Sequence, residues 1–327
     1  MKISPQLLLG VAAALLIPGF ASAQSSTPAW PAKPITLIVD AAPGSSNDAF
    51  ARTIGKRLHE TLGQPVVIDN KPSGGGIIAN SLVAKAAPDG YTLVLLSTTF
   101  TTVAATRASL PYDPIRSFKP VARLATGPML VAVAADSPYK SIQDLVSAAK
   151  AQPGKLAFAS GGNGSPAHLV GESFGQASKL KMLHVPFKGP AEAVTALLGD
   201  QVSAMFATTS VAAPLVRAGK LRALAVTSPQ RLPALPGVPT LAESGLGDIE
   251  LREWEGLVAP AGTPRAIIEQ WNQALFQVLA DPALRNKLAD LGMSVAQANR
   301  PEEFAQLVRQ ELVHWGKFVR ASGLKPG

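Results

Sequence analysis

Apolar runs and helical patterns alternate along most of the chain. The first run, 35–39, ends in small residues and a Pro-Gly turn, and the pattern that follows repeats apolar residues at every fourth position from Phe50 to Leu62. Further runs predict strands at 66–68, 91–96, 129–134, 156–159, 182–185, 202–206 and 221–227. Helical patterns separate most of these runs, which is typical of an α/β protein whose parallel strands are covered by helices on both faces.

Capping residues mark the predicted helix ends. Ser46 or Asn47 can begin the first helix, and Gly63 can end it as a left-handed residue. The last three predicted helices have prolines near their first positions, at Pro264, Pro282 and Pro301. Two α/β sets followed by this helical tail predict two lobes, and a length of 327 residues is consistent with two domains.

The N-terminus has the composition of a secretory signal. Lys2 precedes an apolar run from Leu7 to Leu16, and the small residues 21–23 form a cleavage site. The apolar run is shorter than the ~20 residues that a membrane-spanning helix needs. We therefore expect residues 1–23 to be a cleaved signal peptide and the mature protein to be exported to the periplasm.

Composition and charge exclude several classes of function. The chain has no cysteine, which rules out thiol catalysis and iron–sulfur clusters. Its net charge of +8 comes from scattered Lys and Arg residues without a basic run, so nucleic-acid binding is not predicted. A mildly basic exported protein is suited to acidic small molecules or to a negatively charged surface.

The possible catalytic and cofactor motifs are weak. Gly74-x-Gly76-x-x-Ala79 fits a degenerate dinucleotide fingerprint, but it lies several residues beyond the preceding strand. Ser165 and His168 are three residues apart and could face each other as in a hydrolase, but we favour the interpretation of an N-cap serine beside a half-buried histidine. The four histidines lack the spacing of a zinc site, and no close pair of carboxylates indicates glycosidase chemistry. We predict no catalytic residue, metal or cofactor.

Three loops of small residues follow predicted strands, at 42–47, 97–99 and 161–165. They offer hydroxyls and backbone N–H groups but no acid–base pair. Helix N-termini at the carboxyl ends of strands bind anions, so these loops predict a site that binds and releases a ligand. Helix capping accounts for most of the same residues, and the two roles are compatible.

Several longer segments together carry a family resemblance: 30–35, 42–48, 62–67, 86–93, 110–114, 162–165, 184–189, 219–227 and 257–264. They are similar to the Bug family, the extracytoplasmic solute-binding receptors of tripartite tricarboxylate transport systems. The resemblance covers nearly the whole mature chain and implies a two-lobed α/β periplasmic binding protein of the Venus-flytrap type. Each lobe would be a mixed sheet flanked by helices, with two crossovers between lobes. Lobe 1 is expected at 24–124 plus 248–327 and lobe 2 at 125–247.

The resemblance also implies a site and partners. A small organic acid would be held in the cleft, and two membrane subunits of a transporter would receive it from a receptor that is a monomer; some family members report to a sensor instead. The ligand-binding residues carried over by position are Ala41, Ala42, Ser45, Ser46, Asn47, Ser97, Thr98, Gly162, Asn163, Ser165 and Thr208.

The chain departs from the family pattern at this site. Asp40 and Ala41 replace a usual Pro-Phe pair, Ala207 and Thr208 replace an Asp-Asn pair, and Glu255 stands where an apolar residue is usual. The losses of Phe and Asp should widen the pocket and remove an ammonium partner. Asp40, if it faces the cleft, would repel a second carboxylate and favour an amine or hydroxyl on the ligand; alternatively, a neighbouring N–H group holds it.

Overall fold

The structure is a computed structural model that describes residues 30–246, 249, 252–296 and 300–324, and of Ser46 the backbone only. The predicted signal peptide and the expected start of the mature chain lie outside the described residues. No helix among the described residues is long and apolar enough to cross a membrane.

The first lobe begins with three parallel strands. Strand β1 (Ile35–Val39) lies between β2 (Val66–Asn70) and β3 (Thr92–Ser97). The segments between and after these strands form α1 (Ser46–Leu62), the short 3-10 helix η1 (Gly74–Gly76), α2 (Ile77–Ala84) and α3 (Thr99–Thr106). As predicted, Phe50, Ile54 and Leu58 are buried on one side of α1, and Gly63 ends that helix with a left-handed φ of 68°.

A long strand joins this lobe to the second one. Strand β4 (Phe118–Ala134) pairs along its first part with β9 (Arg252–Pro260) and β10 (Ser294–Val295), and along its last part with β7 and β8, all antiparallel. The apolar pattern predicted only 129–134, because Pro120, Gly127 and Pro128 interrupt the earlier part. The pairing of β4 with β9 has two register shifts, between Pro120 and Ala122 and between Arg123 and Ala125. Pairing continues on both sides of these irregularities, so the strand extends past its first proline.

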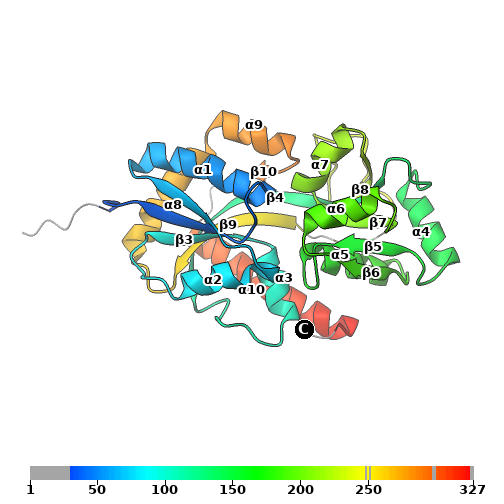
Figure 1. The fold of residues 1–327 in the computed structure, drawn as a ribbon, viewed down its shortest axis with the longest axis horizontal. Helices are drawn as coiled ribbons and strands as arrows, with labels where there is room; N and C mark the ends of the chain where they lie inside the picture. The colour runs from blue at the N-terminus through cyan, green and yellow to red at the C-terminus, as the bar shows by residue number, and fades with distance from the viewer. Residues whose placement is uncertain (1–29, 247–248, 250–251, 297–299, 325–327) are drawn as a thin grey trace, which may run out of the picture.

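The second lobe repeats the α/β pattern. Strand β5 (Ala157–Ser160) is parallel to β6 (Leu183–Pro186) and to β7 (Ala204–Thr208), while β8 (Leu221–Val226) lies beside β4. Its helices are α4 (Ile142–Ala151), α5 (Pro166–Ala177), α6 (Pro190–Leu198) and α7 (Thr209–Arg217). The strand order is β2-β1-β3-β9-β4-β7-β5-β6, and β8 and β10 also pair with β4. One curled sheet therefore runs through both lobes, which lie side by side (Figure 1).

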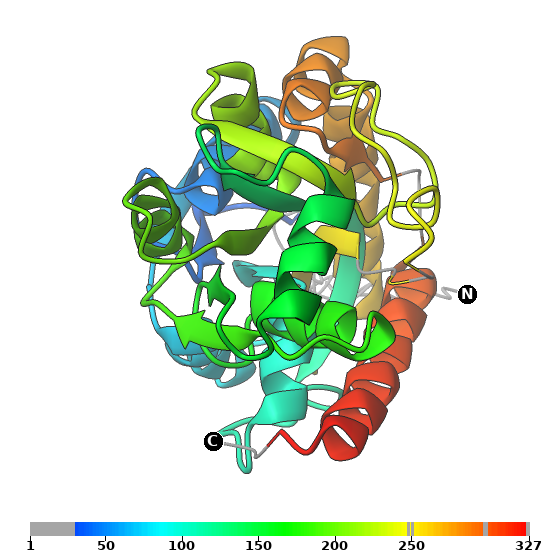
Figure 2. The ribbon, with the colours of Figure 1, turned by 90° about the vertical axis from the view of Figure 1, so that its right-hand side faces the viewer.

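The tail consists of α8 (Arg265–Leu279), α9 (Pro282–Asp290) and α10 (Pro301–Ser322). Helix α10 contacts both lobes: Phe304 packs edge-on against Trp254 of β9, whereas Trp315 and Val319 join the apolar core of the second lobe. Figure 2 shows α10 passing along the side of the molecule. Clusters of buried apolar side chains cover both faces of the sheet in each lobe. The fold is thus the two-lobed, mixed α/β fold of a periplasmic binding protein, while the exact lobe boundaries stay a prediction.

Candidate functional site

Four helices begin where strands end. Helices α1, α3, α5 and α7 follow β1, β3, β5 and β7 after short connections. Ser45 caps α1 by accepting a hydrogen bond from the Asp48 N–H at 3.3 Å, and Ser165 caps α5 by accepting one from the His168 N–H at 3.3 Å. The first N–H groups of a helix have no partner within it and carry partial positive charge. Both lobes therefore contribute ends that favour an anion.

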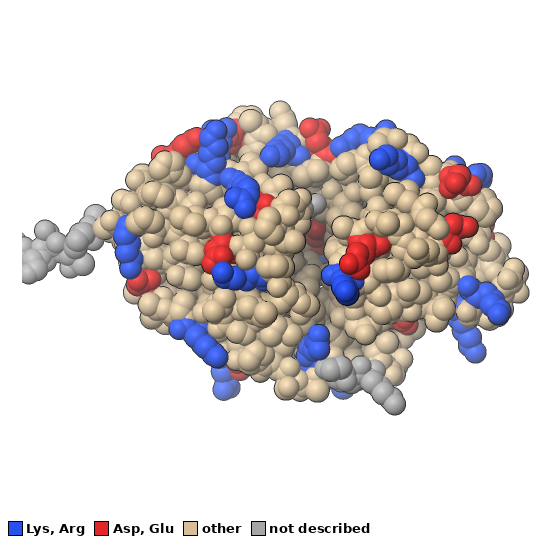
Figure 3. All heavy atoms as spheres, viewed as in Figure 1, with Lys and Arg blue, Asp and Glu red and all other residues tan. Residues whose placement is uncertain are grey.

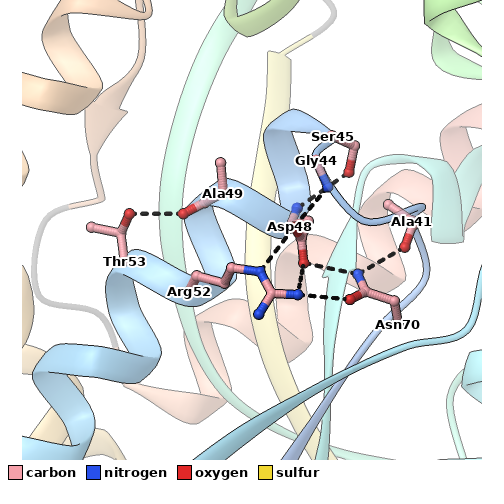
Figure 4. A network of polar contacts seen from close by, with 8 residues as sticks. All are labelled: Ala41, Gly44, Ser45, Asp48, Ala49, Arg52, Thr53 and Asn70. Carbon is pink, nitrogen blue, oxygen red and sulfur yellow. Dashed lines mark hydrogen bonds and ion pairs between the residues drawn. The ribbon is translucent and has the colours of Figure 1, made fainter.

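The loop before α1 is held by a buried acid (Figure 4). Asp48 is 3% exposed; it accepts hydrogen bonds from the Gly44 N–H at 2.8 Å and the Asn70 amide at 2.9 Å, and its ion pair with Arg52 measures 2.9 Å. Hydrogen bonding to Arg52 is the largest cause that lowers the pKa of Asp48 to about 2. Asn70 also donates to the Ala41 carbonyl at 3.0 Å. This network fixes the backbone of the predicted ligand loop.

The equivalent loop of the second lobe is held by two histidines. The Ser160 hydroxyl lies 2.6 Å from His184 Nε2 and accepts a hydrogen bond from the Gly162 N–H at 3.1 Å. The His168 ring stacks on the His184 ring at 3.9 Å and accepts the Gly164 N–H at 3.1 Å. Burial lowers the pKa of His184 to about 3, so this imidazole is neutral at physiological pH.

The same contacts bear on the hydrolase interpretation of Ser165 and His168. The Ser165 hydroxyl accepts the backbone N–H of His168, while Nδ1 of that ring accepts the Gly164 N–H and Nε2 lies 3.9 Å from Glu172. Among the described residues, no hydrogen bond joins the hydroxyl to the ring. The arrangement is that of an N-cap and not of a nucleophile with its base.

The other predicted hydroxyl residues, Ser97, Thr98 and Thr208, lie at the ends of strands. Ser97 is 8% exposed at the end of β3, and its hydroxyl accepts the Thr99 N–H at 3.4 Å. Thr98 is 1% exposed and its hydroxyl accepts the Trp254 N–H at 2.8 Å, so this side chain connects β3 to β9. Thr208 is the last residue of β7 and the N-cap of α7, and its hydroxyl lies 3.1 Å from that of Ser210.

Of the predicted loop residues, Ala42 and Asn163 are exposed, and Asn47 and Gly162 are partly buried. Ser46 is the first residue of α1, but its side chain lies outside the described part of the structure. Figure 3 shows a cleft between the two lobes, with acidic atoms visible within it. The membership of each loop residue in the ligand site stays a prediction.

Two acids of β9 are buried between the lobes, which sequence reasoning did not predict. Glu253 and Glu255 lie on β9 with exposed fractions of 6% and 3%. Ser210 of α7 donates to Oε1 of Glu253 at 3.3 Å, whereas neither Oε2 atom has a hydrogen-bond partner among the described residues. Burial raises the pKa of Glu253 to about 8 and raises the pKa of Glu255 well above its usual range. Glu255 stood out in the sequence only as a departure from the family pattern, and Glu253 was not singled out.

A third acid belongs to this region. Asp40 directly follows β1 and accepts a hydrogen bond from the Asn47 side chain, so a neighbouring N–H does hold it, as one of the two predicted alternatives had it. Its carboxylate lies against Gly76, where an added Cβ would come within 2.6 Å of Oδ2. Burial raises the pKa of Asp40 to about 6, and the charges of Glu253 and Asp40 both raise the pKa of Glu255. The sequence did not predict that the charges of these three acids act on one another.

Other parts of the molecule offer weaker candidates for a binding site. No group of three His, Cys, Asp or Glu side chains among the described residues is placed to hold a metal ion. A hollow of about 290 Å³ lies between β4 and α10 and is lined in part by Phe100, Phe118 and Val308. None of the predicted site residues lines it.

Comparisons with known proteins agree with this architecture. A family model described as "Tripartite tricarboxylate transporter family receptor" matches residues 50–324. The "UPF0065 protein in tcbD-tcbE intergenic region" of Pseudomonas sp. (strain P51) is 39% identical over 292 residues, which cover 89% of this chain and 87% of that protein. The structure of R. palustris Rpa4515 with adipate has a TM-score of 0.86 at 33% identity, covering 91% of this chain and 100% of that one. MatC (Rpa3494) from Rhodopseudomonas palustris with bound malate has a TM-score of 0.81 at 34% identity, covering 89% and 100%.

Proposed function

Because the chain belongs to the family of tripartite tricarboxylate transporter receptors, we propose that it captures a small organic acid between its lobes and delivers it to a membrane transporter. In this proposal the protein is exported to the periplasm, binds its ligand without transforming it, and has the membrane subunits of the transporter as its partners.

The observation that carries the proposal is the arrangement of helix ends. Helix α1 of the first lobe and helices α5 and α7 of the second each begin after a strand, with the hydroxyl residues Ser45, Ser165 and Thr208 at their N-caps. A carboxylate can accept hydrogen bonds from the free N–H groups at such ends. The acids bound in the two Rhodopseudomonas palustris structures, adipate and malate, are of the expected class.

Lobe closure follows from this arrangement. A ligand that bridges donors of both lobes stabilises the closed form by its differential affinity for that form. The hydroxyls of Ser45 and Ser165 in the two loops are engaged in helix capping, and neighbouring side chains are engaged in contacts that hold the loops, for example Asp48 with Arg52 and Ser160 with His184. The loops therefore supply backbone donors, and a capture-and-release receptor needs no proton-transfer group beside them.

Thermal unfolding of mature protein, refolded to remove carried ligand, tests the proposal against di- and tricarboxylates, amino acids and aromatic acids. A ligand at a hundred times its Kd adds about 2.7 kcal/mol of stability, which raises Tm by several degrees. We expect a shift with one chemical series and no chemical change in the bound acid. A panel without any shift, or turnover of a bound acid, would contradict the proposal.

A further inference from the structure

The two glutamates on β9 have oxygens that the protein leaves unpaired. Glu253 and Glu255 are two residues apart on one strand, so their side chains point to the same face of the sheet. Glu255 lies directly opposite Ser97, the last residue of β3, so its side chain stands where the strands end and the ligand loops begin. Ser210 reaches Glu253 from the second lobe. Both acids therefore lie where the two lobes face each other.

Among the described residues, no positive charge acts on the carboxyl groups of these acids. The charges that act on Glu255 are those of Glu253 and Asp40, and the hydrogen bond that acts on the Glu253 carboxyl group comes from Ser210. A buried carboxylate without a partner is costly, and removal of a partner from a buried charge is strongly destabilising. These carboxyl groups therefore need a hydrogen-bond donor from outside the protein, and a positively charged donor would compensate them best.

We propose that Glu253 and Glu255, together with Asp40, form a subsite for a protonated amine, so that the solute is a zwitterion with a carboxylate and an ammonium group. This inference rests on the proposed function, because the helix ends are assigned to the carboxylate. An ammonium group has three N–H donors and no acceptor, and its hydrogen bonds to carboxylates are among the stronger ones in proteins. The two unpaired Oε2 atoms and the Asp40 carboxylate can receive these donors.

An organic cation fits the arrangement better than a metal ion does. The acids do not form a metal-binding group among the described residues, and hard cations require several oxygens at 2.0–2.6 Å. A dicarboxylic acid fits less well, because a second ligand carboxylate would add a negative charge beside three carboxyl groups. The alternative, in which protonated glutamates donate hydrogen bonds to such a carboxylate, predicts the opposite dependence of binding on pH.

Isothermal titration of the refolded mature protein with matched probes tests the subsite. Succinate and aspartate differ by one ammonium group, as do hexanoate and 6-aminohexanoate. We expect the amine-bearing member of at least one pair to bind tenfold or more tightly than its partner. If the acids bind and the amine gives no gain in either pair, the subsite is wrong while the receptor function stands.

Three variants locate the effect. Glu255→Gln and Glu253→Gln keep the side-chain shape, and each should reduce the preference for the amine tenfold or more while binding of the plain acid is retained. Glu269→Gln changes an exposed acid of α8 that pairs with Arg265 and should leave the preference unchanged. A preference that survives in both β9 variants would contradict the proposal, and two separate substitutions guard against a single folding failure.

The pH dependence separates the two roles of the glutamates. In the unliganded protein the raised pKa of Glu253 keeps it protonated near pH 7, so binding of an ammonium group releases protons. Affinity for the amine should then rise from pH 6 to pH 8, over which an alkyl ammonium stays charged. Tighter binding of succinate at pH 6 than at pH 8 in the wild type, but not in Glu253→Gln, would favour the donor role of the glutamate and contradict the subsite.

The probes also distinguish the subsite from the proposed function. If hexylamine binds and no acid does, the subsite stands and the proposed function falls; if no probe binds, both fall.

Discussion

Asp48 and the glutamates of β9 are shielded from solvent to a similar degree, yet the protein treats them in opposite ways. Asp48 receives the Gly44 N–H, the Asn70 amide and an ion pair from Arg52, and its pKa falls to about 2. The carboxyl group of Glu253 accepts one hydrogen bond among the described residues, from Ser210, and its pKa rises to about 8. The sign of the shift follows from the partners, because desolvation raises the pKa in both cases.

The difference in partners distinguishes an acid that stabilises the fold from acids that are candidates for ligand binding. A satisfied acid such as Asp48 stabilises the backbone around it, here the loop between β1 and α1. Glu253 and Glu255 each have an Oε2 atom without a hydrogen-bond partner among the described residues, and Glu253 receives its one side-chain hydrogen bond from the second lobe. Perturbed acids with unpaired atoms in a cleft are candidates for ligand contacts. The two kinds of acid should therefore respond oppositely to removal of their charge.

The largest expected effect comes from the glutamates. A carboxyl group whose pKa is higher in the folded than in the unfolded state binds more protons when folded, so stability falls as pH rises from about 4.5 to the folded value of about 8 for Glu253. The slope is at most about 1.4 kcal/mol per pH unit for each such group. Refolded wild type should thus lose a few kcal/mol from pH 5 to pH 8 that the double variant Glu253→Gln/Glu255→Gln does not lose. Urea unfolding at both pH values measures this difference.

The comparison with the variant removes contributions from other titrating groups, which both proteins share. At pH 8 the variant should be the more stable protein, although two polar groups remain buried. Equal pH dependence in the two proteins would show that the glutamates are not desolvated in the unliganded state. The opposite pKa shifts of Asp48 and the glutamates would then no longer distinguish the two kinds of acid.

Much of the fold could be predicted because it depends on local patterns. The apolar run of β1, the repeat from Phe50 to Leu62 and the glycine that ends α1 are all readable within about twenty residues of sequence. Helix α3, with four threonines in its eight residues, gave no such pattern, because β-branched residues are poor helix formers. Strand β9 was also missed, since three of its first four residues, Arg252, Glu253 and Glu255, are charged.

The acid cluster could not be predicted for a related reason. Periodicity shows that Glu253 and Glu255 share a face, but it does not show what covers that face. The covering contact comes from Ser210, forty-three positions away in the sequence and on a different lobe. Likewise, the spacing of Asp48 and Arg52 on a helix predicts their ion pair, whereas the contribution of Asn70 depends on strand pairing between β1 and β2.

The second prediction concerns the satisfied acid. Asp48→Ala leaves the Gly44 N–H, the Asn70 amide and the Arg52 guanidinium without their acceptor, and it should lower the free energy of unfolding at pH 7 by about 2 kcal/mol. Urea unfolding measures the loss. Glu269→Ala, which removes an exposed ion pair, serves as the control and should stay within about 0.5 kcal/mol of wild type. A loss no larger than the control's would mean that the network does not stabilise the loop.

The third prediction tests the partner and not the acid. Arg52 is 54% exposed, so its ion pair is partly screened, and Arg52→Ala should cost about 1 kcal/mol at pH 7. Because a lowered folded pKa gives stability that is present above about pH 4 and is lost as pH falls toward 2, this cost should shrink in acid. An NMR titration should also show the pKa of Asp48 moving up toward 3.8. An unchanged pKa would show that the hydrogen bonds from Gly44 and Asn70 suffice alone.

The smallest expected effect comes from the single partner of Glu253. The hydrogen bond from Ser210 lowers the pKa of Glu253, so Ser210→Ala should raise that pKa further and extend the pH range over which stability falls. At a length of 3.3 Å the bond is weak, and the extra loss of stability from pH 5 to pH 8 should be about 0.5 kcal/mol. In the background of Glu253→Gln the same substitution should change nothing with pH, because the titrating group is gone. A double-mutant cycle measured at both pH values isolates this coupling, and a pH-independent cost of Ser210→Ala in both backgrounds would show that Ser210 acts only by packing.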